Sequence, residues 1–182
     1  DMPNSVKIEY FSQMVYLFSH FGQYTGSGEL QDHYIELERR YNDSLHCIVT
    51  PADPQYLWFD VWYSINNGQQ EGLQEQLSKK VSLSSLTTRD DAMAAYALAR
   101  VYRQNGNEDM FMRCLAMSGI ADIRASNKDI ASLQELAEVL IDQGEILRAY
   151  NYINVCLQIS QEYHNRVRAV SISRVYERIL QG

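Results

Sequence analysis

Four glycines recur at a fixed interval, and this spacing restricts the possible folds more than any other feature of the chain. Gly68, Gly106, Gly144 and Gly182 lie 38 residues apart, and each follows an Asn or a Gln. Glycine is favoured directly after a helix because it enters the left-handed backbone conformation without a steric penalty. Such a period predicts stacked helical hairpins, each of which buries its apolar face against its neighbours.

The two middle repeats share side chains as well as the glycine. Each contains Leu-Ala, a large apolar residue three positions after the Ala, and the Gly four positions later, over residues 96–106 and 134–144. Two packing positions follow five and nine residues after each Gly: Phe111 and Leu115, then Ala149 and Ile153. This order predicts a first helix, a turn at the glycine and a second amphipathic helix.

The rest of the chain fits the same plan with weaker patterns. We expect a single helical-repeat domain over 1–182, made of two N-terminal helices (1–52), a degenerate repeat (53–88), two repeats (89–125 and 126–163) and a terminal capping or connector helix (164–182). Thr88 and Asp91 have the spacing of a capping box at the start of the first clear repeat. We also expect Gly119 to bend or end its helix, and the terminal helix to have one side of its apolar stripe uncovered.

Composition agrees with a helical domain that has its own core. Hydrophobic residues make up 46% and charged residues 21% of 182 positions, which are ordinary values for a globular domain. With three prolines and nine glycines, the chain has few of the turn residues that β-sandwiches and barrels need. The fold class we predict is all-α, a right-handed α-solenoid of antiparallel helix pairs with a period of about 38 residues.

Charge and membrane criteria narrow the possible partners. A net charge of −7 disfavours binding to a nucleic-acid backbone, so we expect no nucleic-acid contact by this part of the protein. The longest mostly apolar stretch, residues 14–18, is far shorter than the roughly 18 to 20 residues that span a bilayer. Because the chain begins at Asp1 without a Met, we expect it to be part of a larger protein.

No pattern of catalytic, cofactor-binding or metal-ligating residues stands out. The four histidines never occur at the spacings of metal sites. Cys47, Cys114 and Cys156 cannot all pair, and we expect the last two to be buried as small apolar residues of second helices. We place the acidic group of Glu135, Glu138 and Asp142 on the solvated side of its helix. We therefore expect no cofactor and no enzymatic activity.

The repeat pattern resembles a known family. Leu98-Ala99, Tyr102 and Gly106, with their counterparts 38 residues later, are similar to the tetratricopeptide repeat, whose unit has about 34 residues. The longer period implies an extra turn or short loop between units, around 88–91 and 126–129. A second resemblance, carried by the segments 118–125, 131–137, 148–153 and 172–173, is to the sensor region of bacterial membrane regulators. In those regulators such repeats precede a single membrane helix and a C-terminal domain of uncharacterised function.

The tetratricopeptide resemblance implies a partner-binding groove. In that family, exposed positions of the first helix of each hairpin line a concave groove that receives a peptide or a partner helix. The positions ten and six residues before each glycine are Trp58 and Trp62, Tyr96 and Arg100, Gln134 and Glu138, and Ile172 and Tyr176, of which we expect the first six to line the partner-binding groove. Aromatic side chains give a large contact area at a low cost in entropy. The alternative is that Trp58 and Trp62 pack on the preceding helix.

The regulator resemblance implies a class of function. It implies a non-enzymatic sensor or interaction module of a bacterial transcriptional or signalling regulator, which binds a protein or peptide. The alternative is a cytoplasmic adaptor scaffold. The resemblance places the chain on the periplasmic side of the inner membrane, with the membrane reached only through residues beyond Gly182. The sequence leaves a homodimer open and does not identify the partner.

Overall fold

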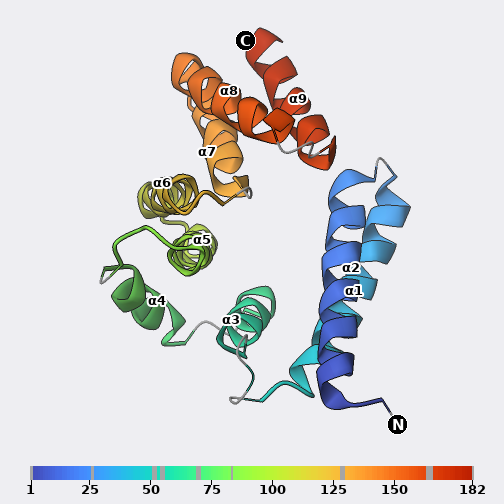
Figure 1. Cartoon of the computed structure of the whole chain (residues 1–182). Helices are drawn as coiled ribbons and strands as arrows, with labels where there is room; N and C mark the ends of the chain where they lie inside the picture. Colours follow the sequence, from blue (N-terminus) through green and yellow to red (C-terminus); the bar gives the residue numbers. More distant parts are fainter. Residues whose placement is uncertain are drawn as a thin grey trace. The chain divides into compact units, whose positions relative to one another are not determined.

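A computed structural model describes residues 2–25, 27–50, 53, 56–68, 71–82, 84–127, 130–162 and 166–181. Helices make up most of this described part of the chain, and it contains no strand (Figure 1). The helices are α1 (Asn4–Tyr24), α2 (Gly28–His46), α3 (Tyr56–Asn66), α4 (Leu73–Ser82), α5 (Arg89–Gln104), α6 (Glu108–Arg124), α7 (Ala131–Asp142), α8 (Ile146–Glu162) and α9 (Arg166–Gln181). The predicted all-α class is confirmed.

The chain divides into two compact units, Asp1–Gln69 and Gln70–Gly182. The first contains α1 to α3 and the second contains α4 to α9. The expected repeats 89–125 and 126–163 lie within the second unit. The two helices of the degenerate repeat 53–88 belong to different units, α3 to the first and α4 to the second.

Aromatic side chains hold the first unit together. The ring of Phe18 on α1 stacks against Tyr34 and Tyr41 of α2, with centroid separations of 6.2 and 5.6 Å. At the end of α2, His46 stacks on Tyr63 of α3 with its ring centroid 3.8 Å away. Such ring pairs add to the apolar burial between helices. The buried residues around α3 are Leu45, Val49, Trp58, Val61 and Ile65.

The second unit is a series of helical hairpins. In sequence order, each of its helices from α4 to α9 contacts the next, and α9 also contacts α7. The four packing positions that follow the glycines, Phe111, Leu115, Ala149 and Ile153, are fully buried, as the repeat pattern predicts. The alanine-rich face of α5 is buried as well, which allows neighbouring helices to approach closely. Helices α5 and α6 therefore form one helical hairpin, and α7 and α8 form the next.

The repeat glycines end their helices in the predicted way. Gly106 and Gly144 have φ angles of 71° and 78°, in the left-handed region. The N–H of Gly106 donates to the Arg103 carbonyl, and the next N–H donates back to Tyr102, which satisfies two carbonyls at the end of α5. The same pair of bonds closes α7 at Gly144. Gly182 lies outside the described residues.

The start of α5 is also as predicted. The Thr88 hydroxyl accepts a hydrogen bond from the Asp91 N–H at 3.1 Å, and the Asp91 carboxylate accepts from the Thr88 N–H at 3.0 Å. These two bonds satisfy backbone donors that the first turn of a helix leaves unpaired. The expected capping box is confirmed.

Two expectations about helix ends are wrong. Gly119 does not end α6, which continues to Arg124. A Cβ atom at Gly119 would lie 3.6 Å from Cβ of Leu133, so this glycine lies where α6 packs closely on α7. The second wrong expectation is that one side of the apolar stripe of the terminal helix is uncovered. Ile172, Val175 and Ile179 are buried because α9 packs on both α8 and α7.

Candidate partner-binding face

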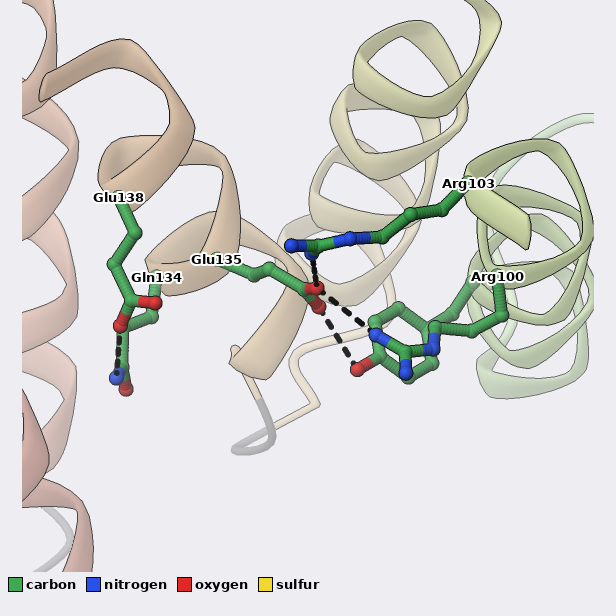
Figure 2. A network of polar contacts seen from close by, with 6 residues as sticks. Arg100, Arg103, Gln134, Glu135 and Glu138 are labelled. Atoms are coloured by element: carbon green, nitrogen blue, oxygen red, sulfur yellow. Dashed lines mark hydrogen bonds and ion pairs between the residues drawn. The ribbon is translucent and has the colours of Figure 1, made fainter. Parts of the chain in front are cut away.

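Three side chains from one stripe of α5 meet a single carboxylate of α7. Tyr96, Arg100 and Arg103 are spaced four and three residues apart, so they share one face of the helix. Tyr96 Oη donates to Oε2 of Glu135 at 2.9 Å. Nη1 of Arg100 and Nη1 of Arg103 donate to Oε1 of Glu135 at 3.1 and 2.7 Å (Figure 2). These contacts join the first helices of two consecutive hairpins.

The burial of this cluster is uneven. The Glu135 side chain is 17% exposed, whereas Arg100 is 38% and Arg103 is 48% exposed. The Arg103 guanidinium also lies over the Phe111 ring of α6, 4.8 Å from its centroid, which is a cation–π contact. The Glu135 side chain is therefore mostly covered, while both arginine side chains stay partly exposed.

A second set of polar contacts joins α7 to α9. Gln134 Nε2 donates to Oε1 of Glu138 at 3.2 Å, as Figure 2 shows. The Ser171 hydroxyl of α9 donates to Oε1 of Gln134 at 2.9 Å. Further along the same two helices, Nη2 of Arg178 lies 2.6 Å from Oδ1 of Asp142. Polar contacts thus run across three successive first helices, α5, α7 and α9.

Burial changes the titration of Glu138. Loss of solvent around its carboxyl group raises the pKa, and the charges of Glu135 and Asp142 raise it further. The Gln134 hydrogen bond and the Arg178 charge act in the opposite direction without cancelling the effect of burial. Glu138 therefore holds its negative charge less strongly than an exposed glutamate does.

The structure places four of the six expected groove residues on this face of the second unit. Tyr96 and Arg100 bind Glu135, and Gln134 and Glu138 bind each other. Gln134 is buried, whereas the other three are partly accessible. Their use in partner binding stays a prediction.

The two remaining groove residues lie in the first unit, on α3. Trp58 is 9% exposed and belongs to the core of that unit, whereas Trp62 is half-buried. Little of the Trp58 side chain is therefore accessible to a partner in this structure.

The centre of the face, Glu135, was not among the expected groove residues. The sequence pattern predicts that Glu135 lies on the solvated side of its helix. That prediction is wrong, because three hydrogen-bond donors surround the Glu135 carboxylate. The repeat register pairs Tyr96 with Gln134, one position earlier, so the period itself does not mark Glu135. The stripe of Tyr96, Arg100 and Arg103 is the one local signal that α5 presents several donors on one side.

Other features of the structure bear on the chemistry of the site. Among the described residues, no group of three or more His, Cys, Asp or Glu side chains is arranged to hold a metal ion. Within the same residues, no helix is long and apolar enough to cross a membrane. Cys114 and Cys156 are buried thiols in α6 and α8, as expected, and Cys47 is exposed.

Comparison with known proteins identifies the family of the chain. Neither a curated protein nor a solved structure matches the chain. The family model described as the SusR N-terminal TPR domain matches residues 1–174. Tetratricopeptide repeats stack such hairpins into extended surfaces that typically bind proteins or peptides. The chain therefore belongs to the family of SusR N-terminal TPR domains, a family of tetratricopeptide-repeat interaction modules.

Proposed function

We propose that this chain is a non-enzymatic sensor module, which binds a protein or peptide for a bacterial signalling or transcriptional regulator. The observation that carries the proposal is the polar face of α5 and α7, where Arg100 and Arg103 stay accessible although Glu135 fixes them in place. Guanidiniums held in this way can bind a partner with little further loss of side-chain entropy. Membership of an interaction-domain family supports the same conclusion.

The arrangement of the face suits recognition better than catalysis. Its charged groups are engaged with one another in fixed geometry, and the half-buried Glu138 carboxyl is bound by the Gln134 amide. The expected outcome is that purified protein gives no turnover with broad panels of hydrolase and transferase substrates. Turnover that co-purifies with the protein and disappears in a point variant of this face would contradict the non-enzymatic part of the proposal.

The compartment is part of the proposal. We place the module on the periplasmic side of a bacterial inner membrane, attached there through other parts of a larger protein, as in the regulators that the sequence resembles. Fusion of the native full-length gene to alkaline phosphatase within this region should give active phosphatase, and the matching β-galactosidase fusion should be inactive. The opposite pattern would place the module in the cytoplasm.

The binding face can be tested by site-specific cross-linking in native cells. A photoreactive residue placed at Gln104, an exposed position one turn after Arg100 on α5, should give a discrete adduct whose partner mass spectrometry identifies. The matched control carries the same residue at Arg113, an exposed position on α6. Tyr96→Ala combined with Arg100→Ala should abolish the adduct from the probe at Gln104, while circular dichroism shows an intact helical fold. An equal yield of the same adduct from Arg113 would contradict the assignment of the face.

A further inference from the structure

The cluster at Glu135 carries an excess of positive charge. Arg100 and Arg103 both form ion pairs with the one carboxylate of Glu135. Arginine stays protonated in proteins, so two positive charges face one negative charge within the described contacts. A further carboxylate at this position would make the cluster neutral. The charge balance therefore favours an anionic group on a partner.

The two guanidiniums also retain the hydrogen-bonding groups that bind a carboxylate. Each guanidinium has five N–H donors in a planar fork, and the contacts to Glu135 use one terminal nitrogen of each. Arginine forks bind carboxylates through two parallel hydrogen bonds. The exposed fractions of 38% and 48% leave part of both side chains accessible. The Phe111 ring beneath Arg103 and the Glu135 anchor hold this arrangement before a partner arrives.

The other acidic groups of α7 weaken this positive site less than their number suggests. Asp142 forms an ion pair with Arg178 of α9. Glu138 accepts a hydrogen bond from the Gln134 amide, and the positive charge of Arg178 offsets part of its negative charge. The net charge of −7 of the whole chain is therefore not representative of this face.

We propose that Arg100 and Arg103 bind a carboxylate side chain in an acidic segment of the partner peptide, while Glu135 remains beneath them as their anchor. This inference rests on the proposed function and specifies the chemistry of its partner. Displacement of Glu135 is not required, and it would leave a largely buried carboxylate without its three donors. Binding is electrostatic in part, so it weakens as salt concentration rises.

The test uses peptides of defined charge and NMR of the whole chain. The probes are the peptide Glu-Gly-Glu-Gly-Glu-Gly and its neutral twin, in which each Glu is Gln. The Nε–Hε signals of Arg100 and Arg103 should shift and saturate with the acidic peptide only. Arg100→Gln combined with Arg103→Gln should weaken binding by at least about tenfold. The matched control, Arg113→Gln with Arg148→Gln, removes the same charge from α6 and α8 and should change binding by less than about twofold.

Four outcomes would overturn the proposal. They are the absence of saturable binding by the acidic peptide, equal binding of both peptides, equal loss in the control variant, and inorganic phosphate binding that matches the peptide. The last outcome would show a site for small anions and not for a peptide. If the probe at Gln104 still captures a partner and Tyr96→Ala with Arg100→Ala abolishes that capture, the proposed function stands although this inference fails. The acidic peptide could also bind as expected while Tyr96→Ala with Arg100→Ala leaves the yield of the cross-linked adduct unchanged. In that case the assignment of the partner face fails.

Discussion

The carboxylate of Glu135 on α7 accepts a hydrogen bond from the Arg103 guanidinium of α5 across 2.7 Å. Arg103 in turn lies over the ring of Phe111 on α6. Arg103 of α5 therefore contacts two neighbouring helices. These are α6, the second helix of its own hairpin, and α7, the first helix of the next hairpin. The polar face is in this way part of the contact between repeats as well as a candidate binding surface.

Removing the Glu135 carboxylate should destabilise the second unit. We expect Glu135→Ala to lower the free energy of unfolding by roughly 1–3 kcal/mol, because hydrogen bonds to charged groups are lost in a mostly covered position. Urea unfolding followed by circular dichroism measures the change. Glu177→Ala, which truncates an exposed glutamate of α9, is the control. Equal effects of the two substitutions would contradict a stabilising role for Glu135.

Truncating a buried leucine beside this face should lower the free energy of unfolding by more than Glu135→Ala does. Leu136 is 6% exposed, and Leu136→Ala should lower the free energy of unfolding by about 2–5 kcal/mol because it removes buried methyl groups and leaves a cavity. Leu147→Ala on α8 is the matched control, since the Leu147 side chain is 74% exposed. Calorimetry compares both with the parent chain. An unchanged melting temperature for Leu136→Ala would mean that the repeat register is wrong.

Helices and turns follow from local patterns, and the sequence therefore predicts them closely. The terminal helix expected within 164–182 extends over Arg166–Gln181, and the turns at Gly106 and Gly144 have the expected conformation. Gly119 shows the limit of this reasoning. Glycine ends helices, but it also permits two helices to pack closely, and only the neighbouring Leu133 distinguishes the two roles.

The site is harder to predict because it depends on contacts between distant residues. Tyr96 and Glu135 are separated by 38 intervening positions, and their contact depends on how α7 is rotated against α5. A step of one residue turns a side chain by about 100° around its helix. The repeat register identifies the correct helix face for Gln134, but not that its neighbour Glu135 completes the cluster. Nothing in the sequence pattern of α7 distinguishes the covered Glu135 from a solvated glutamate.

The turn after α6 contains a residue whose backbone strain a substitution by glycine should relieve. Ser126 has a φ of 51°, a left-handed conformation that costs a residue with a Cβ about 1–2 kcal/mol. Ser126→Gly should raise the free energy of unfolding by about 0.5–1 kcal/mol, since part of the gain is offset by the greater freedom of glycine when unfolded. Gly144→Ala, at a φ of 78°, is the inverse control and should lower it by about 1–2 kcal/mol. Thermal unfolding that changes in the same direction for both variants would contradict this account.

The three cysteines should react at very different rates. Burial raises the pKa of the Cys114 thiol to about 11, against the opposing charge of Arg113, so little thiolate is present at pH 8. Cys47 is exposed, whereas Cys156 is buried like Cys114. The native protein should therefore react with Ellman's reagent at one thiol, and at all three after unfolding in urea. Cys47→Ser should remove the native reaction, and rapid labelling that persists in this variant would contradict the burial of the other two.

The capping box at the start of α5 should make stability depend on acidic pH. Hydrogen bonds from the Ser84 hydroxyl and from the N–H groups of Thr87 and Thr88 lower the pKa of Asp91 from its ordinary 3.8 to about 2. The unfolded chain therefore takes up this proton first as the pH falls. The stabilisation of the folded chain by the ionised Asp91 carboxylate is complete above pH 3.8. It declines as the pH falls towards 2, and it is absent below pH 2.

Two variants separate the charge of this capping box from its hydroxyl. Asp91→Asn should remove the corresponding part of the decline in unfolding free energy between pH 4 and pH 2, measured by urea titration at several pH values. Thr88→Ala should cost about 1 kcal/mol at pH 7, because the Asp91 N–H loses its acceptor. It should nevertheless keep most of the pH dependence, since the Ser84 hydroxyl and the Thr87 N–H still bind the carboxylate. If Asp91→Asn shows the same decline as the parent chain, Asp91 is not the group that links the stability of α5 to pH.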